Sequence, residues 1–265
     1  MLNEAIRSAE EGLKVFADID TVNYNSVKES VEGAFRFLQS AMFPSHVNNE
    51  GRTITENLLL TCAGLQSAIT RLTDSESAEK FVTGLILRLP EIRRVLQTDI
   101  IAAYRGDPAA KSPDEIVLAY PIFTAVSAYR VAHELYDMGV PLVPRIITEY
   151  AHRLTGIDIH PGAKIGEYFF IYHGTGVVIG ETATIGDRVK IYQNVTIGAK
   201  SFDVSPDGSL VKGIKRHPDI GNDVVIYAGA TILGGETRIG DGCVIGGNVW
   251  LTHSVEAGCV VLNEK

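Results

Sequence analysis

An aliphatic side chain returns at every sixth position over most of the sequence beyond Gly156, and this period constrains the fold more than any other feature. The positions that follow it are Ile159, Ile165, Ile171, Ile179, Ile185, Ile191, Ile197, Ile220, Ile226, Ile232, Ile239, Ile245 and Leu251. Side chains repeat every two residues on a strand and about every 3.6 on a helix, so neither element explains a sustained six. Short flat strands joined by tight turns do, because each hexapeptide then forms one side of a triangular coil. We therefore expect a left-handed parallel β-helix over residues 157–260.

The repeat also predicts where the coil turns and where it is interrupted. Glycine often follows the aliphatic residue, as at Gly186, and we expect it to serve turns that need a positive φ. Two extra residues follow Ile171, one follows Ile232, and residues 199–219 abandon the period. Interruptions of this kind usually become loops, and the polar turn sequence at 205–208 predicts a projecting, functional one.

The sequence before Gly156 follows helical spacing instead and holds only seven of the 26 glycines. The apolar sets are Val27, Val31, Phe35, Leu38 and Met42; Leu58, Cys62, Leu65, Ile69 and Leu72; and Phe81, Leu85 and Leu89. Recurrence at three and four residues predicts one buried stripe on each of three helices. We expect Asn25 and Ser26 to cap the first helix and Pro90 to restart the third.

Two further helices are expected before the repeats begin. One runs from Pro113 to Tyr136, and a shorter one fills residues 144–155 before Gly156. The chain is thus predicted to be α+β by halves: an all-helical domain of residues 1–156, followed by a β-helix domain of residues 157–265.

Charge and cysteine content narrow the partners and the compartment. Thirty-two acidic against 24 basic residues give a net charge of −8 and a pI near 5.4, which argues against a nucleic-acid or anionic-membrane surface. The three cysteines, Cys62, Cys243 and Cys259, lack metal-ligand spacing, so we expect reduced thiols and no metal site. The start has no basic segment, and no stretch reaches the ~18 apolar residues of a spanning helix. These features favour a cytoplasmic protein without a membrane partner, acting on a small molecule.

Four motifs on the repeats carry a resemblance to a known family. They are Gly156-Ile157-Asp158-Ile159-His160-Pro161-Gly162-Ala163, His173-Gly174-Thr175-Gly176, Gly180-Glu181-Thr182 and Lys215-Arg216-His217-Pro218. Together they resemble the serine O-acetyltransferases, a family of hexapeptide-repeat acetyltransferases, and the resemblance reaches back to Asp107. It implies transfer of the acetyl group of acetyl-CoA to the hydroxyl of L-serine, giving O-acetylserine and CoA, the first step of cysteine biosynthesis. Acetyl-CoA is then a co-substrate, and no cofactor is bound permanently.

Assembly is expected from geometry alone. A short β-helix exposes flat faces, and threefold packing suits a triangular cross-section, so we expect a homotrimer. The helical domain would serve oligomerisation and contribute Asp107 to the site. Whether two trimers pair through this domain is left open.

His173 is the candidate general base, because a serine hydroxyl is a poor nucleophile at neutral pH while a thioester is already reactive. It lies beside the interruption after Ile171, where a side chain can leave the prism. A surface histidine between turn residues is the alternative interpretation. Asp158 lies 15 residues earlier, close to one coil of about 18, so its carboxylate is expected to approach the ring of His173. In the family it orients the imidazole; an acidic cap beside Gly156 is the alternative.

The remaining site residues follow from the resemblance. In the family, the residues that match Arg216 and His217 hold the carboxylate of the amino acid, a task that suits a guanidinium. The residue that matches His217 is also catalytic. Asp107 would pair with the substrate ammonium, unless it is a simple turn aspartate. The residues expected along acetyl-CoA, between neighbouring subunits, are Ala199, Lys200, Ala228 and Gly229, with Lys212 and Lys215 either meeting CoA phosphates or simply solvated.

Two departures from the family pattern bear on specificity. Tyr172 stands where the family has an aspartate, a second partner for the serine ammonium. The glycine-rich run after Ile197 is replaced by residues 199–202 and a longer loop. Two alternatives therefore stay open: an acetyltransferase of this fold acting on another small hydroxyl acceptor, or a trimeric scaffold without activity.

Two other expectations concern zinc and a protein partner. A hexapeptide-repeat carbonic anhydrase needs three convergent histidines, two of them about five residues apart. The histidines on the repeats, His160, His173, His217 and His253, offer no such pair.

Many relatives bind the sulfhydrylase that consumes O-acetylserine through a C-terminal tail ending in isoleucine. The sequence ends at Asn263-Glu264-Lys265, so we expect no complex of that type.

Overall fold

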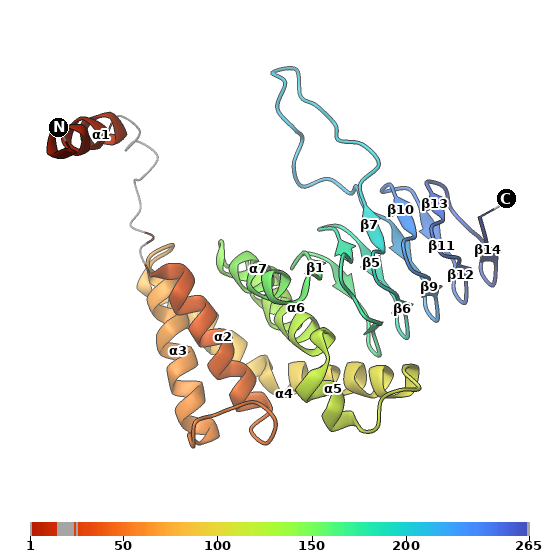
Figure 1. Ribbon diagram of the computed structural model, residues 1–265, viewed down its shortest axis with the longest axis horizontal. Helices are drawn as coiled ribbons and strands as arrows, with labels where there is room; N and C mark the ends of the chain where they lie inside the picture. Colours follow the sequence, from red (N-terminus) through yellow and green to blue (C-terminus); the bar gives the residue numbers. More distant parts are fainter. Residues whose placement is uncertain (1, 15–23, 25, 264–265) are drawn as a thin grey trace.

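The computed structural model describes residues 2–14, 24 and 26–263, and places a helical half before a parallel β-helix (Figure 1). The helices are α1 (Leu2–Lys14), α2 (Val27–Met42), α3 (Ile54–Thr70), α4 (Ser75–Gly106), α5 (Pro113–Ala119), α6 (Pro121–Asp137) and α7 (Val143–Thr155). Asn25, expected as a cap, and Glu264 and Lys265 of the tail lie outside the described residues.

The successive turns of the β-helix add their strands to three parallel sheets, and the last turn adds only the isolated bridge of Val255 to sheet B. Sheet A holds β1 (Asp158–Ile159), β4 (Val178–Ile179), β7 (Thr196–Gly198), β10 (Thr231–Leu233) and β13 (Trp250–Leu251). Sheet B holds β2 (Lys164–Ile165), β5 (Thr184–Ile185), β8 (Asp219–Ile220) and β11 (Arg238–Ile239). Sheet C holds β3 (Phe170–Ile171), β6 (Lys190–Ile191), β9 (Val225–Ile226), β12 (Val244–Ile245) and β14 (Val260–Val261).

The strand register stacks the predicted aliphatic residues on one another along the prism axis. Ile159 pairs with Ile179, Ile179 with Ile197, and Ile197 with Ile232. All thirteen predicted positions are buried. The expected left-handed parallel β-helix behind a helical half is confirmed, and its core is the ladder that the period of six predicted.

The glycines after the aliphatic residues serve a different purpose from the one expected. None of them has a positive φ, whereas corner residues such as His173 and Asn194 do. A Cβ on Gly186 would lie 2.8 Å from the carbonyl carbon of Gly221, and one on Gly221 would lie 2.8 Å from the backbone nitrogen of Asp241. The expectation of left-handed glycines was wrong, because these glycines let the backbones of successive coils pack closely.

Helix α4 runs through Pro90 without restarting. The proline removes one backbone hydrogen bond, but Leu89 and Ile92 are buried on either side of it, and that burial outweighs the loss. Ser26 occupies the N-cap of α2 in a left-handed conformation and makes no side-chain cap hydrogen bond. The expected restart at Pro90 and the expected side-chain cap at Ser26 were therefore wrong, although the predicted apolar stripe of α2 is buried.

The helix expected over 113–136 is two helices, α5 and α6, bent by 82°. Pro121 disfavours helical geometry in the residue before it, and Tyr120 is extended at φ −87° and ψ 132°. The break turns the Tyr120 side chain toward the end of α4, where it meets Asp107. Within the described residues, no single helix is long and apolar enough to cross a membrane; this bent pair reaches that length and composition only jointly.

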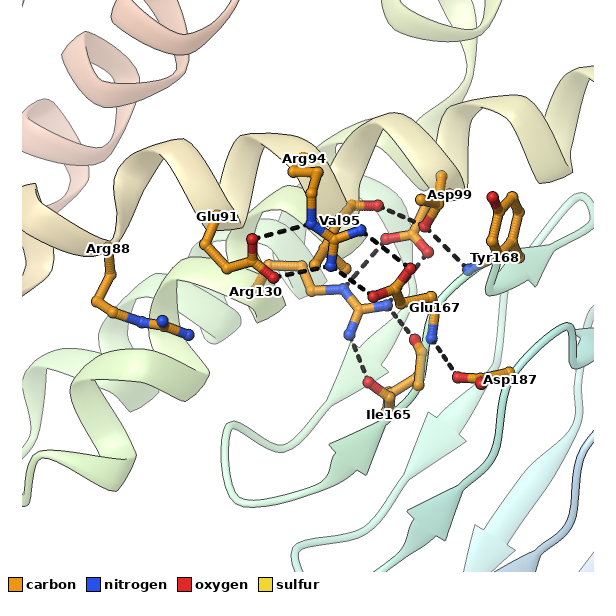
Figure 2. Close-up of polar contacts among 12 residues, drawn as sticks. Arg88, Glu91, Arg94, Val95, Asp99, Arg130, Ile165, Glu167, Tyr168 and Asp187 are labelled. Carbon is orange, nitrogen blue, oxygen red and sulfur yellow. Dashed lines mark hydrogen bonds and ion pairs between the residues drawn. The ribbon is translucent and has the colours of Figure 1, made fainter.

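Side chains of the helical half cap the first coil of the β-helix (Figure 2). The Arg130 guanidinium binds both carboxylate oxygens of Asp99 at 3.1 Å and donates to the carbonyls of Ile165 at 2.5 Å and Gly166 at 2.6 Å. Asp99 also accepts the backbone N–H of Phe169 at 2.9 Å. Burial raises the pKa of Asp99 to about 6, against the opposing effect of Arg130. Polar groups at the open end of the coil are thereby satisfied, and the two halves are joined.

Candidate active site

Two corners of the prism carry the predicted site residues. The CA corner joins sheet C to sheet A at residues 172–177, 192–195 and 227–230, and the AB corner joins sheet A to sheet B at residues 160–163, 180–183 and 199–218. Asp107, Tyr172 and His173 gather at the CA corner, whereas Arg216 and His217 lie at the AB corner.

Asp107 is the C-cap residue of α4 and is almost fully covered. Its Oδ2 accepts the Tyr120 hydroxyl at 2.6 Å, and its Oδ1 accepts the N–H of Ala109 at 2.8 Å and the Tyr172 hydroxyl at 3.3 Å. The Tyr120 hydrogen bond holds the pKa of Asp107 below its usual range and raises that of Tyr120 to about 12. The carboxylate is therefore fixed in place and ionised at neutral pH, as a binder of cations requires.

His173 stands exposed in the interruption between β3 and β4, with φ at 61°. Its ring packs against that of Tyr172, with centroids 4.2 Å apart and planes 33° apart. Within the described residues, no side-chain hydrogen bond to His173 is recorded. The imidazole thus faces away from the prism with its nitrogens available, the arrangement that a general base needs.

Asp158 does not meet His173 as expected within one chain. The register of β1 sets Asp158 beside Val178, on sheet A, and its Oδ1 lies 4.0 Å from Nη2 of Arg145 in α7. No hydrogen bond or ion pair between Asp158 and His173 is recorded across residues 26–263. The physical reason is that coil spacing alone takes no account of the helical half, whose Arg145 attracts this carboxylate.

Asp158 also belongs to a small acidic cluster at the end of α7. One ligand atom each from Glu149, His152 and Asp158 lie within 4.8 Å of one another. Arg145 pairs with Glu149 as well as with Asp158, so a guanidinium already balances the two carboxylates. The cluster is therefore an ion-pair network rather than a favourable metal site.

Arg216 is held at the AB corner by Glu181. Its Nη2 donates to Oε2 of Glu181 at 2.5 Å, and its backbone N–H donates to the Thr182 hydroxyl at 2.9 Å. Tyr136 of α6 donates to the other oxygen of Glu181 at 2.9 Å. Burial opposes ionisation of Glu181, but the hydrogen bonds from Arg216 and Tyr136 lower its pKa below the usual range. The guanidinium is consequently oriented by a charged partner before any ligand arrives.

His217 is buried beside Arg216 and is neutral. Its Nδ1 accepts the backbone N–H of Thr182 at 3.1 Å, which leaves the ring proton on Nε2 as a donor. Burial, with the nearby Arg216, lowers the pKa of His217 to about 4. A Cβ on Gly180 would lie 2.0 Å from Nε2, so only glycine leaves room for this ring.

The residues expected along acetyl-CoA are divided between the same two corners. Ala199 and Lys200 begin the long loop at the AB corner, which projects from the prism (Figure 1), whereas Ala228 and Gly229 lie at the CA corner. Of the other lysines considered, Lys215 donates to the carbonyl of Thr182 and to Asp219 and is not simply solvated. Within one chain, the fold thus brings together neither the residues predicted to bind the acceptor nor those predicted to bind acetyl-CoA.

Comparison with known proteins shows which proteins this chain is similar to. No family model matches the chain. A plasmid-borne serine acetyltransferase of Synechococcus elongatus is 58% identical over 187 residues, which cover 71% of this chain and 58% of the relative. The chain thus spans little more than half the length of that relative. A serine acetyltransferase of Mycobacterium tuberculosis is 45% identical over 167 residues, covering 63% of this chain and 69% of the relative.

A solved structure matches over nearly its whole length. The crystal structure of Entamoeba histolytica serine acetyltransferase 1 in complex with L-cysteine has a TM-score of 0.81 and 35% identity, covering 90% of this chain and 98% of that one. The chain belongs to the serine acetyltransferase family. The resemblance carried by the sequence motifs is confirmed. As a member of this family, the chain departs from the expected pattern at Tyr172, which shares a carboxylate with Tyr120.

Sequence reasoning gave no role to several residues that build these two corners of the serine acetyltransferase fold. Glu181 and Thr182 lie in a quoted motif, and the Gly-Glu-Thr spacing after Ile179 was the available signal. Tyr120 and Lys190 carried no signal, because the residues that they contact, Asp107 and Gly106, lie 13 and 84 residues away in the chain.

Proposed function

We propose that this chain transfers the acetyl group of acetyl-CoA to the hydroxyl of L-serine, giving O-acetylserine and CoA. The observation that carries the proposal is the pair of charge-specific groups prepared for an amino acid. An ionised, hydrogen-bonded Asp107 suits the ammonium, and an oriented Arg216 beside the Nε2–H donor of His217 suits the carboxylate. The names of the relatives and the L-cysteine bound to the Entamoeba protein support an amino-acid ligand.

A complete site requires two copies of the chain. The CA and AB corners flank sheet A, so three prisms with sheet A toward a common axis would bring the CA corner of one copy to the AB corner of the next. The outward side chains of sheet A past Asp158 are uncharged, and Val178 and Trp250 are exposed. Sheet B instead presents Lys164 and Arg238 to solvent. These features support a homotrimer with three composite sites.

In this arrangement His173 takes the hydroxyl proton as the oxygen attacks the thioester carbonyl. The C–S bond then breaks, and the imidazolium returns the proton to the CoA thiolate. Asp107 and the Tyr172 hydroxyl hold the ammonium, while Arg216 and His217 of the neighbouring copy hold the carboxylate. Asp158 is proposed to act on His173 through its negative charge at the same edge of sheet A, rather than by a direct hydrogen bond.

Acetyl-CoA is proposed to follow the same boundary between copies. Backbone groups at Ala228 and Gly229 of one copy and at Ala199 and Lys200 of the next would contact its pantetheine arm. The helical domain of residues 1–156 contributes Asp107, and residues 157–265 form the catalytic domain. The three free thiols support a reducing compartment, the cytoplasm.

The test is CoA release from acetyl-CoA, recorded with each proteinogenic amino acid, with N-acetylserine and with small alcohols. We expect serine to be the best acceptor and N-acetylserine, which lacks the ammonium, to be poor. A better acceptor without a free amino group would replace serine with another hydroxyl compound. No release with any acceptor would favour the inactive scaffold.

A further inference from the structure

Lys190 projects from β6 into a cage of three aromatic rings beside Asp107 and His173. Its Nζ lies 5.2 Å from the ring centroid of Phe170 and 5.0 Å from those of Tyr172 and Tyr192. An ammonium within about 6 Å of an aromatic face is attracted by the ring quadrupole. Three such contacts together fix the position of the charge, although the rest of the side chain is only half-buried.

The same ammonium binds the end of helix α4. Nζ donates to the carbonyl oxygen of Gly106 at 2.7 Å, and a cation at a helix C-terminus interacts favourably with the helix dipole. Gly106 itself touches the cage, because a Cβ there would lie 2.7 Å from Cδ1 of Phe170. Asp107 is the next residue along the chain. Lys190 therefore ties the backbone that carries Asp107 to sheet C of the β-helix.

Tyr172 connects this contact to the base. Its ring is in contact with the Lys190 ammonium, and its centroid lies 4.2 Å from that of the His173 ring. Its hydroxyl donates to Asp107 at 3.3 Å. Asp107 comes from the helical half and His173 from the β-helix, so their separation depends on how the two halves are joined here. A small displacement of catalytic groups is costly, because bound substrates must lie in a near-attack geometry.

We propose that Lys190 is a positioning residue that sets the distance between Asp107 and His173 by clamping the end of α4 onto the aromatic cage. The proposal rests on the proposed acetyl transfer to an amino acid, since it gives Asp107 the ammonium to hold. Lys190 acts through Gly106 and Tyr172, so its removal should weaken binding of the acceptor rather than binding of acetyl-CoA.

The kinetic test compares Lys190→Met, Lys190→Arg and Lys80→Met, the last an exposed lysine on α4 that serves as control. Losing one such anchor is expected to raise KM for serine about three- to tenfold in Lys190→Met, with KM for acetyl-CoA unchanged. Lys190→Arg should recover most of the loss, because a guanidinium also stacks on aromatic rings and donates hydrogen bonds. An unchanged KM for serine in Lys190→Met, or an equal rise in both KM values, would overturn the positioning role.

A second measurement without substrate separates this proposal from the proposed function. Hydrogen exchange of the Asp107 and Ala110 amides, which bond to the carbonyls of Ala103 and Asp107, reports on the end of α4. Exchange should be faster in Lys190→Met than in the wild-type chain and unaltered in Lys80→Met. Unaltered exchange in Lys190→Met would overturn the clamp. Faster exchange in Lys190→Met, together with a wild-type chain that releases no CoA, would leave the clamp standing and sink the acetyl transfer.

Discussion

The two corners of the prism differ in which parts of the chain build them and in how exposed their histidines are. At the CA corner, Asp107 arrives from the helical half and meets His173 of the β-helix through Tyr172. At the AB corner, Arg216 and His217 are held by Glu181 and Thr182 of the β-helix. The proposed base, His173, is exposed, whereas His217, proposed to bind the carboxylate, is buried and neutral.

The difference between the two histidines would separate proton transfer from recognition of the carboxylate. Exposure leaves His173 with solvent-accessible nitrogens, which a base must have to accept a proton in each turnover. Burial lowers the pKa of His217 and fixes its tautomer, which suits a hydrogen-bond donor that should not titrate. Neither corner holds both the proposed base and the guanidinium proposed to bind the carboxylate. Changes at His173 and at Arg216 should therefore alter different kinetic constants.

The largest effect is expected at the base. His173→Ala should lower the turnover number by a factor on the order of 100 to 10,000, because general-base catalysis is lost. Steady-state CoA release measures it. His253→Ala, an exposed histidine near the end of the β-helix, is the matched control and should leave turnover unchanged. Near-native turnover in His173→Ala would remove the base from the account.

A smaller effect, confined to acceptor binding, is expected at Arg216. Arg216→Lys keeps the charge but loses the planar donors, so kcat/KM for serine should fall by about 10- to 100-fold, mainly through KM. Serinamide, which lacks the carboxylate, provides the control acceptor. The wild-type chain and Arg216→Lys should use serinamide equally well. An equal loss with both acceptors would mean that Arg216 does something other than bind the carboxylate.

The buried histidine should reveal itself in stability rather than in rate. The pKa of His217 is lowered to about 4, so the folded chain resists protonation while the unfolded chain binds a proton below about pH 6.5. The stability that the folded chain gains from a neutral His217 is present above pH 6.5 and is lost as pH falls toward 4. We expect His217→Asn to flatten that part of the stability profile by about 1 kcal/mol, after allowance for partial solvent access. Urea unfolding from pH 7 to 4.5 measures it; parallel profiles would contradict the burial effect.

The smallest effect is expected at Tyr172. Its phenol has an ordinary pKa of ~10, which burial and the nearby Asp107 raise further, so it carries no charge at neutral pH. Tyr172→Asp would supply a second carboxylate for the ammonium and should lower KM for serine about threefold to fivefold, with turnover within a small factor. Tyr172→Phe keeps the ring against His173 and serves as control. Loss of activity in Tyr172→Asp would show that the ring orients His173 or the acceptor.

The repetitive features of the fold were predictable from sequence, whereas contacts between distant segments were not. Every coil repeats one local rule, so the ladder through Ile179 and Ile197 follows from spacing alone. Helix α4 continued through Pro90 because tertiary burial outweighed a local penalty. The same limitation affected Asp158, which lies 15 residues before His173 in the sequence but whose carboxylate is drawn to Arg145 of the helical half.

The division of the site could not be seen in the sequence for a related reason. Arg216 and Asp107 are both motif residues, but the corner on which each lies depends on where the interruptions fall within the coil. Family motifs report which residues act together without reporting which chain supplies them. The roles of the individual residues remain predictions for the experiments above.

The central claim, that each site is shared by two copies, is tested by mixing two inactive variants. His173→Ala lacks a working CA corner and Arg216→Ala a working AB corner, so each alone should be nearly inactive. Random assembly of equal amounts into trimers would pair an intact CA corner with an intact AB corner in about a quarter of the sites. We predict recovery of about a quarter of the wild-type activity when the two variants are co-expressed. Activity that stays at the level of the separate variants would contradict the claim and place the whole site within one chain.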